Sequence, residues 1–224
     1  MHHPLYTPGT KGKTLLAIGD SLTAASENYG GDYGNPSFLG ILKEELELAE
    51  AVNKGIGSTC LARSYDARSN GNSFIDRYER GEFDFSKADL CYFWYGHNDQ
   101  CQKILLGEPG TDDVTTWRGA LRFLMTELSQ KYEGRALFVT PLSVGEGLWP
   151  HPENTTLRDF RDSLIELCIQ FGFPYLDVYG MCQINPANCD PKYGYTRDGI
   201  HMTQKGYGRL LDLFVPALRS LCGE

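Results

Sequence analysis

Residues 15–23, Leu-Leu-Ala-Ile-Gly-Asp-Ser-Leu-Thr, decide how the rest of the sequence is interpreted. The apolar run ends abruptly at Gly-Asp-Ser, and short apolar runs bounded by turn formers are typical of buried strands. We therefore predict a first strand at 14–19. Ser21 would follow the carboxyl end of this strand, where open α/β sheets bind their ligands.

The pattern of a short apolar run followed by an amphipathic segment recurs along the chain. Further strands are predicted at 51–53, 88–95, 136–140 and 174–178, and helices at 36–46, 69–79, 117–128, 157–171 and from 203 onward. Alternating strands and helices indicate a parallel sheet covered on both faces, which is one doubly wound α/β domain. Residues 1–12 are expected to form an N-terminal arm, and residues 13–224 the single domain.

Local signals are expected to set three features of the helices. Asn35 is predicted to cap the first helix, with Pro36 at its first position. Thr156 and Asp159 have the spacing of a capping box. Pro216 has no amide hydrogen, so it is expected to kink or restart the last helix.

The composition argues against several classes of partner. The 224 residues include 21 basic and 29 acidic side chains, for a net charge of −8. Nucleic acids and anionic membranes both require a basic surface, so neither is expected as a partner. The apolar runs are far shorter than the ~20 residues that span a bilayer.

The seven cysteines contain no Cys-x-x-Cys pair, so no metal site is expected. We expect free thiols in a cytoplasmic protein. Export after removal of a signal peptide is the alternative, and Cys182 and Cys189 could then pair.

Three predicted strand ends carry turns that could meet, at 19–21, 55–57 and 96–98. Carboxyl ends of parallel strands lie along one edge of the sheet. Ser21 is a candidate nucleophile there, but a serine hydroxyl requires a base. His201 is the candidate base, because Asp198 three residues earlier can hold its other ring nitrogen.

A tetrahedral intermediate also requires donors for its negative oxygen. The candidates are the Ser21 N–H, the Gly57 N–H and the Asn98 side-chain amide. Gly57 has no Cβ to obstruct close approach, although Gly55 is an alternative for the same turn.

The sequence resembles the SGNH (GDSL-type) hydrolases in four blocks that occur in the family's order. They are Gly-Asp-Ser-Leu at 19–22, Gly57, Gly-x-Asn-Asp at 96–99 and Asp-x-x-His at 198–201. The resemblance implies a three-layer α/β/α fold with a five-stranded, parallel, flavodoxin-like sheet. It also implies ester hydrolysis without a metal or an organic cofactor.

The same resemblance assigns Ser21 as nucleophile, His201 as base and Asp198 as its partner, with Gly57 and Asn98 completing the oxyanion hole. Gly-His-Asn-Asp at 96–99 is similar to the third block of rhamnogalacturonan-type carbohydrate acetylesterases. We therefore expect an acyl-enzyme mechanism on short acyl esters, especially acetyl groups of a small or oligosaccharide substrate. A lysophospholipase, a thioesterase and a general short-chain carboxylesterase are the alternatives within this chemistry.

Each of these residues also has a purely structural interpretation. Gly-Asp-Ser could be only a tight turn, Asn98 and Asp198 could cap helices, and His201 could be a surface histidine. A flavodoxin-like module that binds a small ligand would then be the non-enzymatic alternative. That module would require a glycine-rich phosphate loop after the first strand, where this chain has only Gly19.

Four further residues are candidates for binding substrate: Asp20, His97, Trp149 and His151. Aromatic rings in loops suit stacking on sugars, although a tryptophan often anchors its own loop. Asp20 and Asp99 also have a structural alternative, in which they accept backbone N–H bonds that hold the turns.

Overall fold

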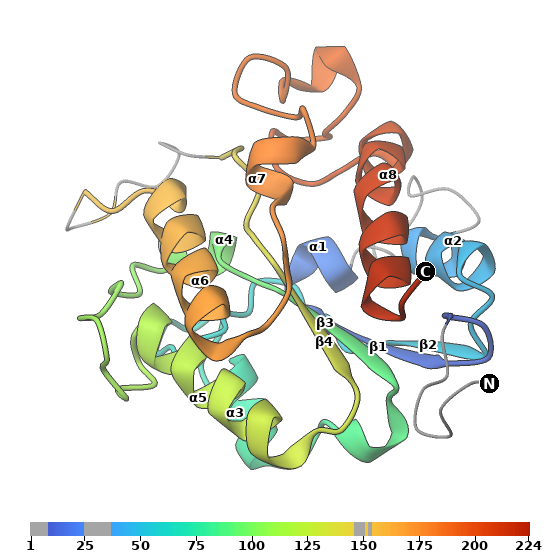
Figure 1. Cartoon of the computed structure of the whole chain (residues 1–224). Coiled ribbons are helices and arrows are strands. Elements are labelled where there is room, and N and C mark those ends of the chain that lie inside the picture. The colour runs from blue at the N-terminus through green and yellow to red at the C-terminus, as the bar shows by residue number, and fades with distance from the viewer. Residues whose placement is uncertain (1–8, 25–36, 146–150, 152–153) are drawn as a thin grey trace.

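The computed structural model describes residues 9–24, 37–145, 151 and 154–224. Its strands form one parallel sheet in the order β2-β1-β3-β4-β5 (Figure 1). Their bounds are β1 (Thr14–Gly19), β2 (Glu50–Asn53), β3 (Leu90–Trp94), β4 (Arg135–Val139) and β5 (Tyr175–Leu176). The predicted five-stranded parallel sheet of an α/β fold is thereby confirmed.

The strand order creates a switch point between β1 and β3. The chain leaves β1 for β2 on one side, and the later strands are added on the other side. Gly19, Trp94 and Val139 are neighbours in the register, so the last residues of β1, β3 and β4 lie side by side. Ligands bind at such a point in open α/β sheets, beyond the carboxyl ends of the strands.

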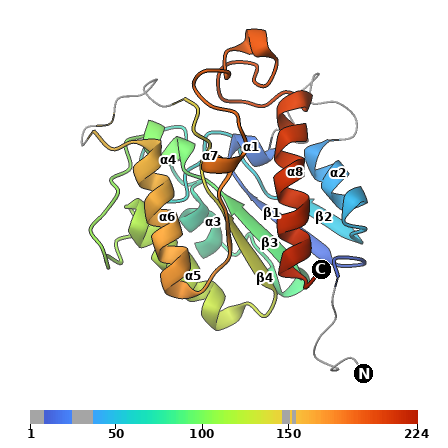
Figure 2. The same ribbon diagram turned by 45° about the horizontal axis from the view of Figure 1, so that its top comes forward.

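Helices cover both faces of the sheet, which makes three layers (Figure 1). One face carries α2 (Phe38–Glu45) and α8 (Gln204–Leu221), and the other carries α3 (Phe74–Glu79), α5 (Trp117–Lys131) and α6 (Leu157–Phe171). Short helices α1 (Ser21–Ala24), α4 (His97–Cys101) and α7 (Val178–Met181) gather at one end of the sheet (Figure 2). Two 3-10 turns occur at Phe85–Lys87 and Pro191–Tyr193.

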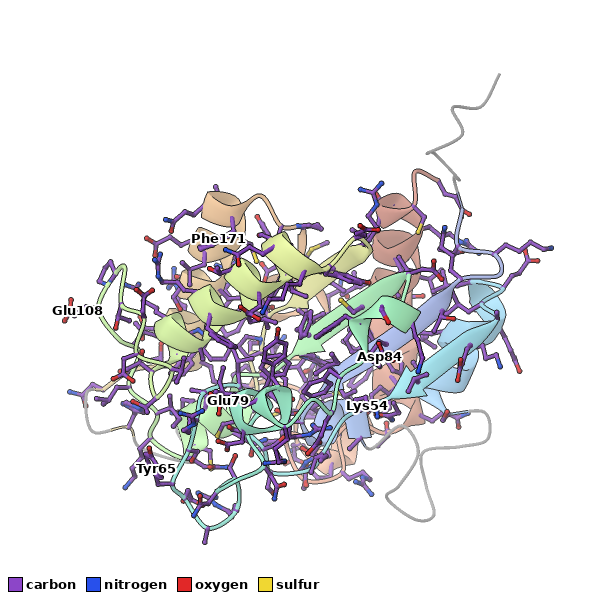
Figure 3. All side chains as sticks on the ribbon, turned by 90° about the horizontal axis from the view of Figure 1, so that it is seen from below. Lys54, Tyr65, Glu79, Asp84, Glu108 and Phe171 are labelled. Carbon is purple, nitrogen blue, oxygen red and sulfur yellow. The ribbon has the colours of Figure 1, made fainter. Side chains whose placement is uncertain are left out.

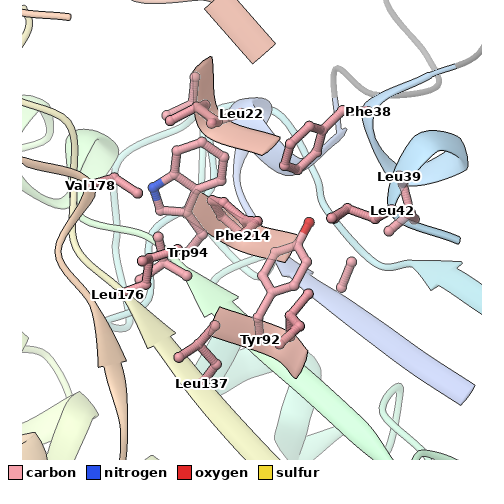
Figure 4. Packing of buried hydrophobic residues seen from close by; sticks show 14 of the residues in the cluster. Leu22, Phe38, Leu39, Leu42, Tyr92, Trp94, Leu137, Leu176, Val178 and Phe214 are labelled. Atoms are coloured by element: carbon pink, nitrogen blue, oxygen red, sulfur yellow. The ribbon is translucent and has the colours of Figure 1, made fainter. Parts of the chain in front are cut away.

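The side chains of each strand alternate between two separate cores. On β3, Tyr92 and Trp94 pack toward α2 and α8. Phe214, a residue of α8, packs against both of these rings (Figure 4). Cys91 and Phe93 point to the opposite face and pack toward α5 and α6. Both faces are therefore apolar, as expected for a parallel strand buried on two sides.

The helix signals in the sequence were partly correct. Thr156 and Asp159 form the predicted capping box, and α8 begins after its cap Thr203. The cap of α2 is Ser37, whose hydroxyl accepts from the Gly40 N–H at 3.0 Å, so the prediction of Asn35 as the cap was wrong. Asn35 and Pro36 themselves lie outside the described residues.

Two further helix predictions also need correction. The third helix, α3, begins at Phe74 rather than 69, because Ser73 caps it and the preceding residues form turns. The last helix, α8, continues through Pro216, so the predicted restart was wrong, whereas the predicted kink stays a prediction. Pro216 is exposed, so the missing amide hydrogen lies on the solvent side of the helix.

All seven cysteines, including Cys182 and Cys189, are free thiols. No helix among the described residues is long and apolar enough to cross a bilayer.

Candidate active site

Close packing at the end of β1 sets the position of Ser21. A Cβ on Gly19 would lie 2.6 Å from the Trp94 carbonyl oxygen, so only glycine allows β1 to turn this close to β3. The chain then enters α1, whose first residue is Ser21. The predicted position of Ser21 beyond the carboxyl end of a strand is confirmed.

Ser21, His201 and Asp198 form one continuous chain of hydrogen bonds. The Ser21 Oγ lies 2.9 Å from His201 Nε2, and His201 Nδ1 lies 2.6 Å from Asp198 Oδ2. The other carboxylate oxygen, Asp198 Oδ1, accepts from the backbone N–H groups of His201 at 2.8 Å and Ile200 at 3.0 Å. The structure thus brings together the three residues that the sequence selected, over a separation of 180 positions.

Electrostatics favour a charged Asp198. Partial burial raises the pKa of this carboxyl, but the bonds from the His201 ring and from the backbone N–H groups of His201 and Ile200 outweigh it and lower the pKa overall. A carboxylate only accepts hydrogen bonds, so it holds the proton of a neutral His201 ring on Nδ1. Nε2 then has its lone pair directed toward the Ser21 hydroxyl, as a general base requires.

Three N–H groups stay the predicted donors for a negative oxygen at Ser21: those of Ser21, Gly57 and the Asn98 side chain. Within the described part of the chain, neither the Ser21 N–H nor the Gly57 N–H donates to a protein acceptor. Asn98 is the second residue of α4, which follows β3 after Gly96. Gly96 has a φ of +126°, a backbone conformation that favours glycine.

Gly55 and Gly57 have different surroundings, which bears on the choice between them. A Cβ on Gly55 would lie 2.9 Å from the Ala24 Cα and even closer to the Ala24 backbone nitrogen, so Gly55 allows the loop after β2 to pack on α1. Gly57 lies in the next turn, between Ile56 and Ser58. A steric requirement for glycine is therefore shown at Gly55, and the Gly57 N–H stays the predicted donor.

Two buried carboxyls lie under this edge of the sheet. Asp20 accepts from the Leu22 N–H at 2.9 Å and from Asn98 Nδ2 at 3.2 Å. Asp99 accepts from the backbone N–H groups of Leu61 at 3.1 Å and Ala62 at 3.0 Å. Burial raises the pKa of each carboxyl to about 7, although the N–H bonds oppose this shift.

The side chains predicted to bind substrate are mostly engaged with the protein itself. Asp20 is 1% exposed, so its contacts are those within the fold and the structural alternative describes it better. His97 and His151 are also buried, and their Nε2 atoms bond to the carbonyl oxygens of Val144 at 3.2 Å and Ile104 at 3.0 Å. Burial lowers the pKa of His97 to about 4, so its ring stays neutral. Contact of these histidines with substrate stays a prediction, and Trp149 lies outside the described residues.

Tyr207 supports the site, although the sequence indicated only that it lies on the apolar face of a helix. The Tyr207 hydroxyl donates to the Leu22 carbonyl oxygen at 2.8 Å, which ties α8 to α1 beside Ser21. A single apolar-face tyrosine carries no signal in the sequence that would distinguish this role from packing. Across the described residues, no group of three or more His, Cys, Asp or Glu side chains could hold a metal ion.

Two loops carry residues at the rim of the molecule. Tyr65, in the loop between β2 and α3, is 74% exposed and extends into solvent at the rim of the molecule (Figure 3). Glu108, in the loop between α4 and α5, also lies at the rim (Figure 3).

Solved structures share this fold over nearly their whole length. A protein from Lactobacillus plantarum is 22% identical with a TM-score of 0.78, over 94% of this chain and 98% of that one. A possible lipase from Chitinophaga pinensis is 20% identical with a TM-score of 0.73, over 93% and 98% of the two chains. A variant of an acetyl xylan esterase from Geobacillus stearothermophilus is 20% identical with a TM-score of 0.61, over 94% and 96%.

No curated protein sequence matches the chain. The sequence model of the GDSL-like lipase/acylhydrolase family matches residues 17–209, which is most of the chain and includes all four blocks. The reaction class that this family supports is the hydrolysis of esters. The match confirms the resemblance noted in the sequence: the chain belongs to the GDSL-like lipase/acylhydrolase family.

Proposed function

We propose that the chain is a serine ester hydrolase that works through an acyl-enzyme on Ser21. The observation that carries this proposal is the unbroken path from Ser21 Oγ through His201 to Asp198, with distances of 2.9 and 2.6 Å. Nucleophile, base and orienting carboxylate within hydrogen-bond reach are the geometric signature of nucleophilic catalysis.

The reaction proceeds in two symmetrical halves. Ser21 Oγ attacks the ester carbonyl carbon while His201 Nε2 takes the hydroxyl proton. The tetrahedral intermediate collapses as His201 returns that proton to the leaving alcohol oxygen, which leaves an ester on Ser21. Water then attacks this ester, again with His201 as base, and the acid is released with Ser21 restored.

The carbonyl oxygen becomes negative in both halves and requires donors. We assign this role to the Ser21 N–H, the Gly57 N–H and the Asn98 amide, which follow β1, β2 and β3 beyond the carboxyl edge of the sheet. Removal of one such donor costs ~3–4 kcal/mol of barrier in related chemistry.

For the substrate we propose a short acyl ester, with an acetyl group on a carbohydrate as the first choice. Two observations support this choice: the Gly-His-Asn-Asp sequence at 96–99, and the likeness in fold to an acetyl xylan esterase. The likeness to a possible lipase supports the rival group of lysophospholipases, thioesterases and general carboxylesterases. Turnover of acetylated oligosaccharides, lysolipids and acyl thioesters at matched concentrations separates these classes, and preference for lysolipids would reject the carbohydrate ester.

Ser21→Ala tests the mechanism directly. We expect it to lose at least ~10³-fold in kcat on a chromogenic acetyl ester, because no hydroxyl remains to form the acyl-enzyme. Thermal unfolding should be nearly unchanged, since Ser21 is only half-buried. An organophosphate probe should label the wild type at Ser21 and leave the variant unlabelled. Wild-type turnover by Ser21→Ala would reject Ser21 as the nucleophile, whereas absence of labelling together with stabilisation by nucleotide would favour the flavodoxin-like binding module.

A further inference from the structure

Asp20 occupies a position that the proposed mechanism leaves without a role. Its side chain is 1% exposed, so it does not face substrate, yet it lies directly before Ser21. Its two oxygens serve two different elements: Oδ1 accepts from the Leu22 N–H of α1, and Oδ2 accepts from Asn98 Nδ2 of α4. Asp20 therefore links the nucleophile's helix to the helix that carries an oxyanion donor.

The chemistry of a carboxylate determines which way the Asn98 amide faces. A side-chain amide has an oxygen and an NH2 group of nearly the same shape, so packing alone selects poorly between its two orientations. With Oδ1 already accepting from the Leu22 N–H, the ionised form of Asp20, which prevails above about pH 7, presents Oδ2 only as an acceptor and selects the orientation with Nδ2 toward Asp20. One N–H of Asn98 is used in this bond, and the second stays available for the substrate oxygen.

We propose that Asp20 is a positioning residue, which holds the Asn98 amide with an N–H rather than an oxygen directed at the developing oxyanion. This inference rests on the proposed function, in which Asn98 is an oxyanion donor. Asp20 itself touches neither the substrate nor the reacting atoms.

Asp20→Asn is the sharpest single change, because it conserves shape and removes one acceptor. The new amide oxygen can keep the Leu22 N–H, but its NH2 group then faces the NH2 group of Asn98. Asn98 relieves this contact by turning over, which directs its oxygen at the substrate. We expect kcat on an acetyl ester to fall about 10²-fold with KM within about threefold, as for loss of an oxyanion donor.

A double-mutant cycle with Asn98→Ala separates positioning from general support of the fold. With Asn98 in place, Asp20→Asn should cost about 10²-fold in kcat, and in the Asn98→Ala background less than about threefold. Asp99→Asn is the matched control, because it alters an equally buried carboxyl that bonds Leu61 and Ala62 and has no bond to Asn98. Its effect on kcat should be the same in both backgrounds.

Asp20→Ser protects the test against a folding failure of the amide variant. A serine hydroxyl can still accept from the N–H two residues ahead, but it is too short to reach Asn98. Its cycle with Asn98→Ala should show the same loss of additivity, and thermal unfolding reports whether each variant is folded.

Equal losses from Asp20→Asn in both backgrounds, or a rise in kcat, would overturn the inference. Ser21→Ala distinguishes failure of the positioning role from failure of the proposed function. If Ser21→Ala is inactive while the Asp20 cycle is additive, only the positioning role fails. If Ser21→Ala keeps wild-type turnover, the proposed function fails as well.

Discussion

Asp198 accepts three hydrogen bonds although its side chain is 52% exposed, whereas the His201 ring that it holds is 30% exposed. The bonds to the two backbone N–H groups fix the carboxylate independently of the histidine. The Asp198 side chain should therefore keep its position when its negative charge is removed. The contribution of that charge to catalysis can then be measured separately from the contribution of position.

Asp198→Asn is expected to lower kcat about 10³- to 10⁴-fold with the fold intact. The new amide oxygen can keep the backbone N–H groups, and the NH2 group then faces His201 Nδ1. That contact selects the tautomer with its proton on Nε2, which cannot accept the Ser21 proton. Steady-state kinetics on an acetyl ester measure the loss, and circular dichroism checks the fold. A fall of less than about tenfold would contradict the role assigned to Asp198.

Gly55 and Gly57, the two glycines after β2, allow a test of how this loop packs on α1. Gly55→Ala should lower the free energy of unfolding by about 1–3 kcal/mol, because its Cβ would press on the Ala24 backbone in α1. Gly57→Ala should be the less destabilising of the two changes, since Gly57 has no positive φ. Urea unfolding measures both. Greater destabilisation by Gly57→Ala would reverse the assignment of the two positions.

The long elements were predictable from the sequence because each repeats its pattern over several residues. The helix faces of α5 and α6 and the apolar runs of β1 and β3 needed no information from distant residues. Helices α1, α4 and α7 were missed, because five residues or fewer make too few turns to show a period. The strand order also depends on contacts between distant segments, which a single sequence does not contain.

The candidate site was likewise predictable from the sequence only in part. Ser21, Asp198 and His201 were found because their residue types and spacing are chemically specific. Asp20 was assigned to possible substrate contact, since nothing in Gly-Asp-Ser tells whether its carboxyl faces the substrate or the fold. Only the position of Asn98, 78 residues later, resolves this ambiguity.

For the whole molecule, the buried carboxyls Asp20 and Asp99 predict how stability varies with pH. Both have pKa values raised from 3.8 to about 7, chiefly by burial. Between about pH 4 and pH 7 the folded protein keeps protons that the unfolded chain has released. The contribution of these two carboxyls to the free energy of unfolding is therefore complete below about pH 4. It is lost as the pH rises through about 7.

Replacement of Asp99 isolates part of this effect. Asp99→Asn removes a carboxyl that must otherwise ionise while buried, so its destabilisation relative to wild type should be smaller at about pH 7.5 than at about pH 4.5. Urea unfolding at the two pH values gives the comparison. Asp198, whose pKa is lowered, follows the opposite sign and favours folding above about pH 4. A larger penalty for Asp99→Asn at the higher pH would contradict the raised pKa.

The distance of 180 residues between Ser21 and His201 also has a consequence in time. A ribosome adds about 5–20 residues per second, so the serine emerges roughly 10–40 s before the histidine. The nascent chain thus exposes its nucleophile early but has no base to activate it. In the folded chain a buried bond from the Tyr207 hydroxyl to the Leu22 carbonyl oxygen joins α8 to α1. Under the proposed mechanism, a chain that ends before His201 therefore lacks the base for ester hydrolysis.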